Sequence, residues 1–217
     1  MTHAFRAVLA AGLLLAATTA GAAGAAGAEP AGPRTLTYQI RMGDDPIGTE
    51  TVTLEPLGGV TKVAVKAATR VKVLFINFRY DHQREELWKG ATLESMRAKT
   101  DDDGTPHTID MTRRGAGYAV TVDGKTGEVP ADALPLTLWT PEVLKRPTLL
   151  SVIDGKPYSV RVESLGTETL DIGGRAVKAQ HHRIAGDVER DLWFDAEGTL
   201  LKTRFKRSGY DVTYILK

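Results

Sequence analysis

The sequence predicts an all-β protein: a single, strongly curved antiparallel sheet, or an open barrel or sandwich, of about ten strands with one short helix-containing connection. Two observations support this class. From Arg34 onward, short segments alternate apolar and polar residues, which is the pattern of half-buried strands. Pairs of turn-forming residues such as Gly58-Gly59 and Gly173-Gly174 separate these segments.

The first strands have the clearest alternation. RTLTYQIRM (34–42) places Leu36, Tyr38, Ile40 and Met42 on one face. IGTETVTLE (47–55) is expected to follow between turns at 43–46 and 56–59. VTKVAVKAATRVKV (60–73) places valines on one face and basic residues on the other, which predicts a strand with one buried side.

Residues 74–90 (LFINFRYDHQREELWKG) combine strand-forming and charged residues. A helix over Gln83–Trp88 is an alternative, but we interpret the segment as a long strand with a bend. One face of this strand would carry Tyr80, His82, Arg84, Glu86 and Trp88. ATLESMRAKT, HTIDMTR and YAVTVDG continue as strands, and DDDG (101–104) predicts a hairpin turn more readily than a calcium loop.

The alternation breaks once, in residues 130–153, which are rich in proline. Thr140-Pro141-Glu142 predicts the start of a helix, which Pro147 ends within about two turns. We expect this connection to cover one end or face of the sheet as a lid. Further strands are expected in KPYSVRVES, TETLDI, RAVKAQHHRI, VERDLWFD, TLLKTRFKR and YDVTYILK.

Residues 1–28 have the layout of a secretory signal peptide. Arg6 precedes the apolar run Ala7–Ala17, and small residues lead to Ala28. The run is too short for a membrane anchor, although it also suits an apolar N-terminal helix of the folded domain. We therefore expect one mature β domain over 29–217, without a transmembrane segment, in the periplasm or secreted from the cell.

The composition disfavours several classes of function. The chain has 28 Lys+Arg against 27 Asp+Glu and no cysteine. Such a balance disfavours a nucleic-acid binder that relies on bulk charge. Without cysteine the chain forms no disulfide, thiolate zinc site or cysteine nucleophile. We expect no metal and no cofactor, and the oligomeric state stays open.

Four segments carry a resemblance to a known family: TLTYQIRMGDDPIGTETV, REELWKGATLESMRAKTDDDG, LWTPEVL and RIAGDVERDLWFDAEGTLLKTRFK. Together they resemble the DUF6134 family of exported bacterial proteins. The layout is similar, more distantly, to the DUF3108 family. The resemblance implies a location in the bacterial cell envelope and an all-β fold, such as the curved half-barrel of periplasmic lipoprotein carriers. It implies no catalytic residues.

Aromatic residues in these segments suggest a binding function. A concave apolar face left partly uncovered would form a groove for an acyl chain, with residues 135–147 over it. We therefore predict a non-enzymatic binder or carrier of an apolar or amphipathic, lipid-like ligand. Alternatively, the aromatics fill a closed core. The predicted ligand contacts are Phe75, Phe78, Trp88, Trp139 and Trp193.

Two other functions stay open. An envelope hydrolase or lyase would use the face of Tyr80, His82, Arg84 and Glu86, with His82 and Glu86 as the catalytic candidates. The plainer interpretation of this face is a solvated or cross-strand-paired surface. An assembly or scaffold protein would instead work through its sheet edges.

A basic row gives a possible membrane contact. Lys202, Arg204 and Lys206 share one face of a predicted strand, which suits peripheral contact with anionic headgroups of the envelope membrane. Pairing of this row with neighbouring acidic residues is the alternative.

Overall fold

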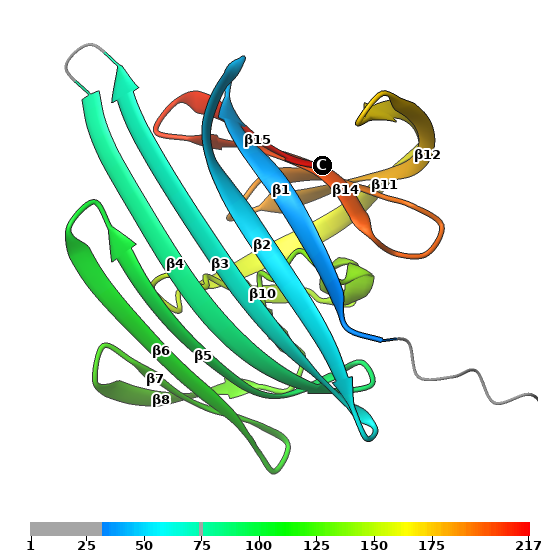
Figure 1. Ribbon diagram of the computed structural model, residues 1–217. Coiled ribbons are helices and arrows are strands. Elements are labelled where there is room, and N and C mark those ends of the chain that lie inside the picture. The colour runs from blue at the N-terminus through cyan, green and yellow to red at the C-terminus, as the bar shows by residue number, and fades with distance from the viewer. Residues whose placement is uncertain (1–31, 74–75) are drawn as a thin grey trace, which may run out of the picture. The chain divides into compact units, whose positions relative to one another are not determined.

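The computed structural model describes residues 32–73 and 76–217, except for the side chains of Val73 and Ile76. The described residues form one compact unit. The described part contains one sheet of fifteen strands, in the order β8-β7-β6-β5-β4-β3-β2-β1-β15-β14-β13-β12-β11-β10-β9. The expected all-β class with a strongly curved sheet is confirmed (Figure 1).

The sheet is built mostly from hairpins between neighbours in the sequence. Its pairs are antiparallel except for β9 with β10, which is parallel, and β1 pairs with β15. The strands are β1 (Arg34–Met42), β2 (Asp45–Leu57), β3 (Val60–Val73), β4 (Ile76–Lys89), β5 (Thr92–Asp102), β6 (Thr105–Arg114), β7 (Gly117–Val122), β8 (Lys125–Pro130), β9 (Ala133–Pro135), β10 (Thr148–Leu150), β11 (Pro157–Ile172), β12 (Arg175–Gly186), β13 (Arg190–Phe194), β14 (Leu200–Arg207) and β15 (Tyr210–Leu216).

The strand number is the main correction to the prediction. About ten strands were expected from alternation, but the described residues form fifteen. β8 is almost fully exposed, so it shows no apolar alternation. β9 and β10 have three residues each, too few for a pattern. In the other direction, β11 is one strand where two were expected, because a bulge between Ser164 and Gly166 carries the strand past the glycine.

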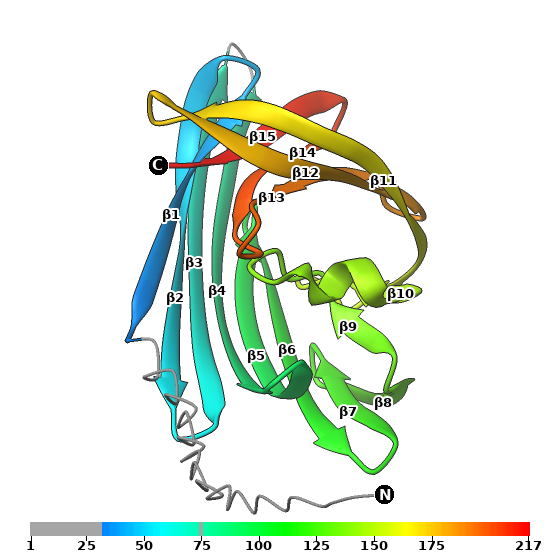
Figure 2. The same cartoon turned by 90° about the vertical axis from the view of Figure 1, so that its right-hand side faces the viewer.

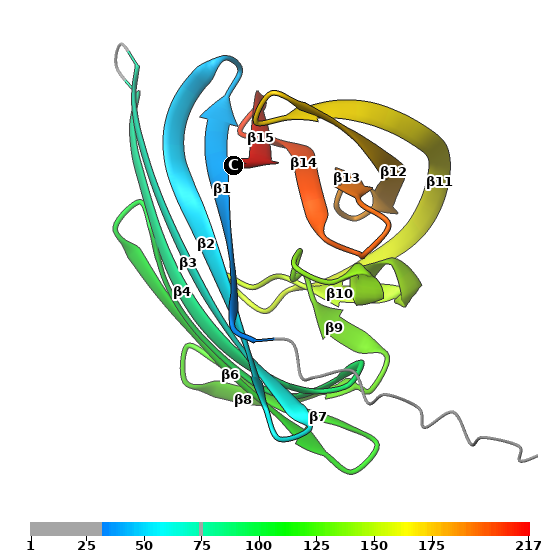
Figure 3. The same ribbon diagram turned by 45° about the vertical axis from the view of Figure 1, so that its right-hand side comes forward.

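Residues 130–153 supply the edge strands β9 and β10 of the sheet and the connection between them, which lies inside the curve of the sheet. The expected helix is present as the short 3₁₀ helix η1 (Pro141–Lys145), and the Thr140 hydroxyl accepts a hydrogen bond from the Glu142 N–H at its start. Figures 2 and 3 show η1, β9 and β10 between the wall of long strands β1–β6 and strands β11–β13. Leu134, Val143 and Leu149 are fully buried in the main apolar core. The segment therefore fills the interior at this end of the sheet.

Residues 74–90 contain the expected long strand, and Gln83–Trp88 is part of β4 rather than a helix. β4 pairs with β3 on one side and with β5 on the other. Because successive side chains of a strand point to opposite faces of the sheet, those of β4 alternate between the exterior and the interior of the curved sheet.

Candidate functional site

The interior face of β4 carries an unbroken row of buried side chains. His82, Arg84, Glu86 and Trp88 share this face, as predicted, and each is at most 6% exposed. Gln83 and Glu85 between them are exposed. The interpretation of this row as a solvated surface is therefore wrong. Alternation shows which residues share a face, but it does not show whether the face is buried, and the charged residues suggested an exposed face.

The row forms a continuous hydrogen-bonded chain. Arg84 Nη1 lies 3.0 Å from His82 Nε2, and His82 Nδ1 lies 2.8 Å from Thr100 Oγ1. A guanidinium only donates, so His82 Nε2 accepts and Nδ1 carries the proton toward Thr100. Burial lowers the pKa of His82 to about 3, which keeps the ring neutral. Both ring nitrogens are thus engaged, which leaves no lone pair free for a general base.

Glu86 joins β4 to the interior connection. Its Oε1 accepts from Arg84 Nε at 2.6 Å, and its Oε2 accepts from the indole N–H groups of Trp88 and Trp139, each at 2.7 Å. The two indole rings pack edge to face with centroids 5.2 Å apart. Arg84 Nη2 also donates to Thr137 Oγ1 at 3.1 Å. These contacts hold the 130–153 segment against β4, which is a structural role.

A polar cavity of about 130 Å³ adjoins the row. His82 and Arg84 lie on one side of it, and the interior connection contributes Leu136, Leu138 and Ser151. β4 also contributes Tyr80, and the other strands contribute ionisable and phenolic side chains: Glu50 from β2, Tyr158 from β11, Arg190 from β13, Arg207 from β14 and Tyr214 from β15. The cavity thus gathers polar groups from both halves of the sheet.

Burial shifts the titration of these groups toward their neutral forms. It raises the pKa of the Glu50 carboxyl and of the Tyr80 and Tyr214 hydroxyls. It lowers the pKa of the Arg190 guanidinium. A cluster of perturbed groups around one cavity is typical of a functional site.

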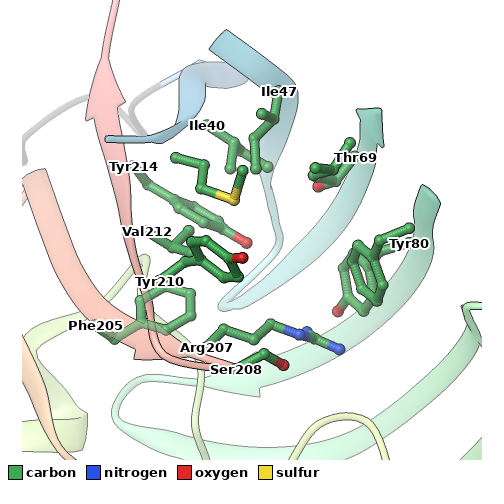
Figure 4. A pocket seen from close by; sticks show the side chains of 13 residues that line it. Ile40, Ile47, Thr69, Tyr80, Phe205, Arg207, Ser208, Tyr210, Val212 and Tyr214 are labelled. Carbon is green, nitrogen blue, oxygen red and sulfur yellow. The ribbon is translucent and has the colours of Figure 1, made fainter. Parts of the chain in front are cut away.

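An apolar cavity of about 120 Å³ lies beside the polar one. Its lining includes Ile40 and Met42 from β1, Val71 from β3, Phe78 from β4 and Val212 from β15. Figure 4 shows side chains from both halves of the sheet around this space, with the Arg207 guanidinium directed toward Tyr80. The two cavities share four lining residues: Tyr80, Phe205, Arg207 and Tyr214. They therefore form adjacent parts of one amphipathic interior.

A larger groove of about 550 Å³ lies next to the polar cavity. The groove shares Val188, Arg190, Phe205 and Arg207 with that cavity, and its rim includes exposed side chains such as Lys206. Arg190 thus lies where the interior meets the outer groove.

The predicted ligand contacts are found in three different environments. Phe78 lines the apolar cavity. Trp88 belongs to the closed core, and Trp139 packs against that core with its N–H bound to Glu86. Trp193 lies in a separate apolar cluster and stacks on His181 at 4.1 Å between ring centroids. Phe75 lies outside the described residues.

The sequence reasoning missed Glu50, Arg190 and Tyr214. A signal was present: Glu50 has the same parity as Val52 and Leu54, and Arg190 has the same parity as Leu192 and Phe194. An ionisable residue on the apolar face of a strand indicates a polar group that points inward.

The basic row on β14 is compensated. Arg204 pairs with Asp191 at 2.9 Å, Lys206 pairs with Asp211 at 3.1 Å, and Lys202 lies over the Trp193 ring at 4.8 Å. Pairing with neighbouring acidic residues, the alternative to a headgroup contact, is therefore found for Arg204 and Lys206, whereas Lys202 packs on an aromatic ring.

The Asp101–Gly104 turn is the expected hairpin, in which the Gly104 N–H donates to Asp101 Oδ1 at 2.7 Å. Within residues 32–73 and 76–217, no three His, Asp or Glu side chains gather as a metal-binding group. No helix in that part of the chain is long and apolar enough to cross a membrane.

The curved sheet and its interior cavities define a class: an all-β, barrel-like protein with an amphipathic interior. The model of the family described as domain of unknown function (DUF6134) matches residues 38–217, and the chain belongs to this family. The expected family is thereby confirmed.

The fold has a counterpart among solved structures. The crystal structure of a beta-barrel-like protein of domain of unknown function DUF1849 from Brucella abortus superimposes with a TM-score of 0.64 at 11% identity. The match covers 85% of this chain and 95% of the other chain. At this identity the likeness shows the fold alone. A comparison with curated proteins finds no match.

Proposed function

We propose that this protein is a non-enzymatic binder or carrier of an amphipathic, lipid-like ligand in the bacterial cell envelope. One observation carries the proposal: an apolar cavity and a polar cavity lie side by side in the interior and share Tyr80, Phe205, Arg207 and Tyr214. Ligand sites are concave, mostly apolar and supplied with a few converging polar groups, and this interior has all three properties.

The cavity size favours a short apolar group. A cavity of about 150 Å³ lined by apolar side chains stays dry and takes up benzene. The apolar cavity, of about 120 Å³, is close to that size. A short alkyl end would therefore fit there, with its polar end in the neighbouring cavity.

Native mass spectrometry of protein purified from the envelope, compared with a cavity-filling variant, tests the proposal. Val71→Phe replaces an aliphatic side chain of the apolar cavity with a larger phenyl ring, whereas Lys72→Phe adds the same ring at the exposed neighbouring position. We expect a copurifying amphipathic molecule in the native protein and in Lys72→Phe, and its loss in Val71→Phe. If all three proteins carry the same ligand load, or none carries any, the proposal is wrong.

We also propose that the protein is exported and acts in the periplasm or outside the cell. The layout of residues 1–28 supports this. Alkaline phosphatase needs disulfides that form after export, so a phosphatase fusion to the full chain should be active. A fusion lacking residues 1–28 should be inactive, and equal activity of the two would contradict export.

The hydrolase or lyase alternative receives no support from the geometry. The His82 ring is neutral and bonded at both nitrogens, and the Glu86 carboxylate is occupied by three donors. Neither candidate offers a free group to a substrate.

A further inference from the structure

Arg190 is the arginine of the polar cavity that forms no ion pair among the described residues. Its Nε is buried and has no hydrogen-bond partner. Among the described residues, no carboxylate forms an ion pair with it, and its guanidinium lies over the Phe205 ring at 3.9 Å from the centroid. A buried N–H group without an acceptor is costly, so the Nε of Arg190 indicates a missing partner. Arg146 Nε is also buried without a partner, but Arg146 lines none of the cavities described above.

The other cations of the cavity have partners. Arg84 is bonded to Glu86 at 2.6 Å, and Arg207 is bonded to Asp102 at 2.5 Å. Their charges are neutralised within the protein. Arg190 is therefore the guanidinium that remains available to a ligand.

The remaining polar groups around the cavity favour an acceptor as ligand. Burial raises the pKa of Glu50, whose carboxyl makes no hydrogen bond to the described residues, and so favours its protonated, donating form. The Tyr80 and Tyr214 hydroxyls also keep their protons, because burial raises their pKa values. Two phenolic O–H donors and a guanidinium thus line the same space as the Glu50 carboxyl.

From this arrangement we infer that the polar cavity binds an oxyanion head group, a carboxylate or a phosphate, with Arg190 as the principal cation and the alkyl chain in the apolar cavity. The inference rests on the proposed function and names its ligand class. Arginine matches both groups because its planar fork donates two parallel hydrogen bonds to either one. Arg190 also lines the outer groove, so this residue is accessible from that side of the protein.

A matched series of probes tests the head group. Octanoate, octyl phosphate, octanol and octylammonium have the same chain and differ in the polar end, and inorganic phosphate has the head group alone. We expect the two octyl anions to bind the full mature chain at least about tenfold more tightly than octanol, as a charge-assisted hydrogen bond predicts. Octylammonium and inorganic phosphate should bind more weakly than octanol.

Variants at Arg190 assign the preference to this residue. Arg190→Gln removes the charge and should bring octanoate binding down to that of octanol, whereas Arg190→Lys should keep part of the preference. Arg161→Gln removes an exposed arginine of β11 and should leave binding unchanged. Circular dichroism of each variant checks that the sheet has formed. Tyr214→Phe tests the same cavity in another way, because it removes one hydroxyl donor and leaves the charge of the cavity unchanged.

The outcomes separate this inference from the proposed function. If octanol binds as tightly as octanoate, or if folded Arg190→Gln keeps the preference for anions, the head-group inference is overturned while a lipid-binding function stands. If inorganic phosphate binds as tightly as octyl phosphate, the site takes a free anion and the amphipathic ligand is overturned. If no octyl probe binds and no ligand copurifies, both proposals fail.

Discussion

Glu86 shows how the interior of this sheet accommodates charge. Its two oxygens accept one N–H from Arg84 and two from indoles. A buried ion pair is tolerated when its remaining hydrogen bonds are satisfied. Arg84 meets the same condition, because its other nitrogens donate to His82 and Thr137. The network is thus complete within the protein, in contrast to Arg190.

The Glu86→Gln substitution should destabilise the fold strongly. The amide would leave the Arg84 charge uncompensated and would direct its own N–H at a donor, a loss of about 3–5 kcal/mol when a buried pair is broken. Urea unfolding followed by tryptophan fluorescence measures the change. Glu85→Gln, at the exposed neighbouring position, is the matched control and should lie within about 0.5 kcal/mol of the native protein. Equal stability of the two variants would contradict the network.

His82 should make stability depend on pH. Its pKa is about 3 in the folded chain against 6.5 ordinarily, so between these values the unfolded chain binds a proton that the folded chain does not. The free energy of unfolding should therefore fall as the pH decreases below about 6.5, by at most about 1.4 kcal/mol per pH unit. Denaturant titrations across this range measure it. His82→Gln should show a shallower dependence than the native protein, and an identical slope would exclude the assignment.

At the scale of elements, the alternation of apolar and polar residues predicted the strands that have one buried face. The bounds of β1 and β3 match the predicted segments, because both strands have one apolar face and end at glycine or at a change of pattern. β8, β9 and β10 were missed because they are exposed or have only three residues. Strand prediction succeeded for strands with one buried face, because their apolar residues recur with a period of two. It failed for strands that are exposed or very short.

The candidate site was predictable only in part. The shared face of Tyr80, His82 and Glu86 follows from parity along one strand. The cavities depend on pairing between β1 and β15, which brings Ile40 opposite Tyr214. No local pattern encodes that long-range pairing, so Glu50 and Arg190 could not be placed beside His82.

Gly48 in β2 is required by close packing of backbones. A Cβ atom built there would lie 2.1 Å from the Ala68 carbonyl oxygen, at a bulge between β1 and β2. Gly48→Ala should therefore cost about 1–3 kcal/mol of stability, as for other overpacked sites. Gly127→Ala in β8, where nothing lies within 4 Å, should be close to neutral. Thermal unfolding of both variants measures the difference, and equal melting temperatures would refute the packing argument.

At the scale of the whole sheet, the β8 edge differs from the central strands in its exposure to solvent. β8 is a short, almost fully exposed edge strand with charged side chains and a terminal proline. Such features discourage pairing with another sheet. The β8 edge therefore gives little support to the alternative of an assembly or scaffold protein that works through its sheet edges.

Hydrogen exchange should follow this gradient. Amides of β8 should exchange through local opening, whereas those of β3 and β4, each paired on both sides, should approach the protection of global unfolding. Mass spectrometry of peptides after timed exchange measures both. Uniform protection across β3, β4 and β8 would contradict the expected gradient.

The pairing of β1 with β15 has a kinetic consequence. The other strand pairs join neighbours in the sequence and can form early, but this contact joins the first and last described strands. Forming it requires closure of a loop that spans almost the entire domain, which is slow. Because β1 and β15 both line the apolar cavity, we expect this cavity to be completed late in folding.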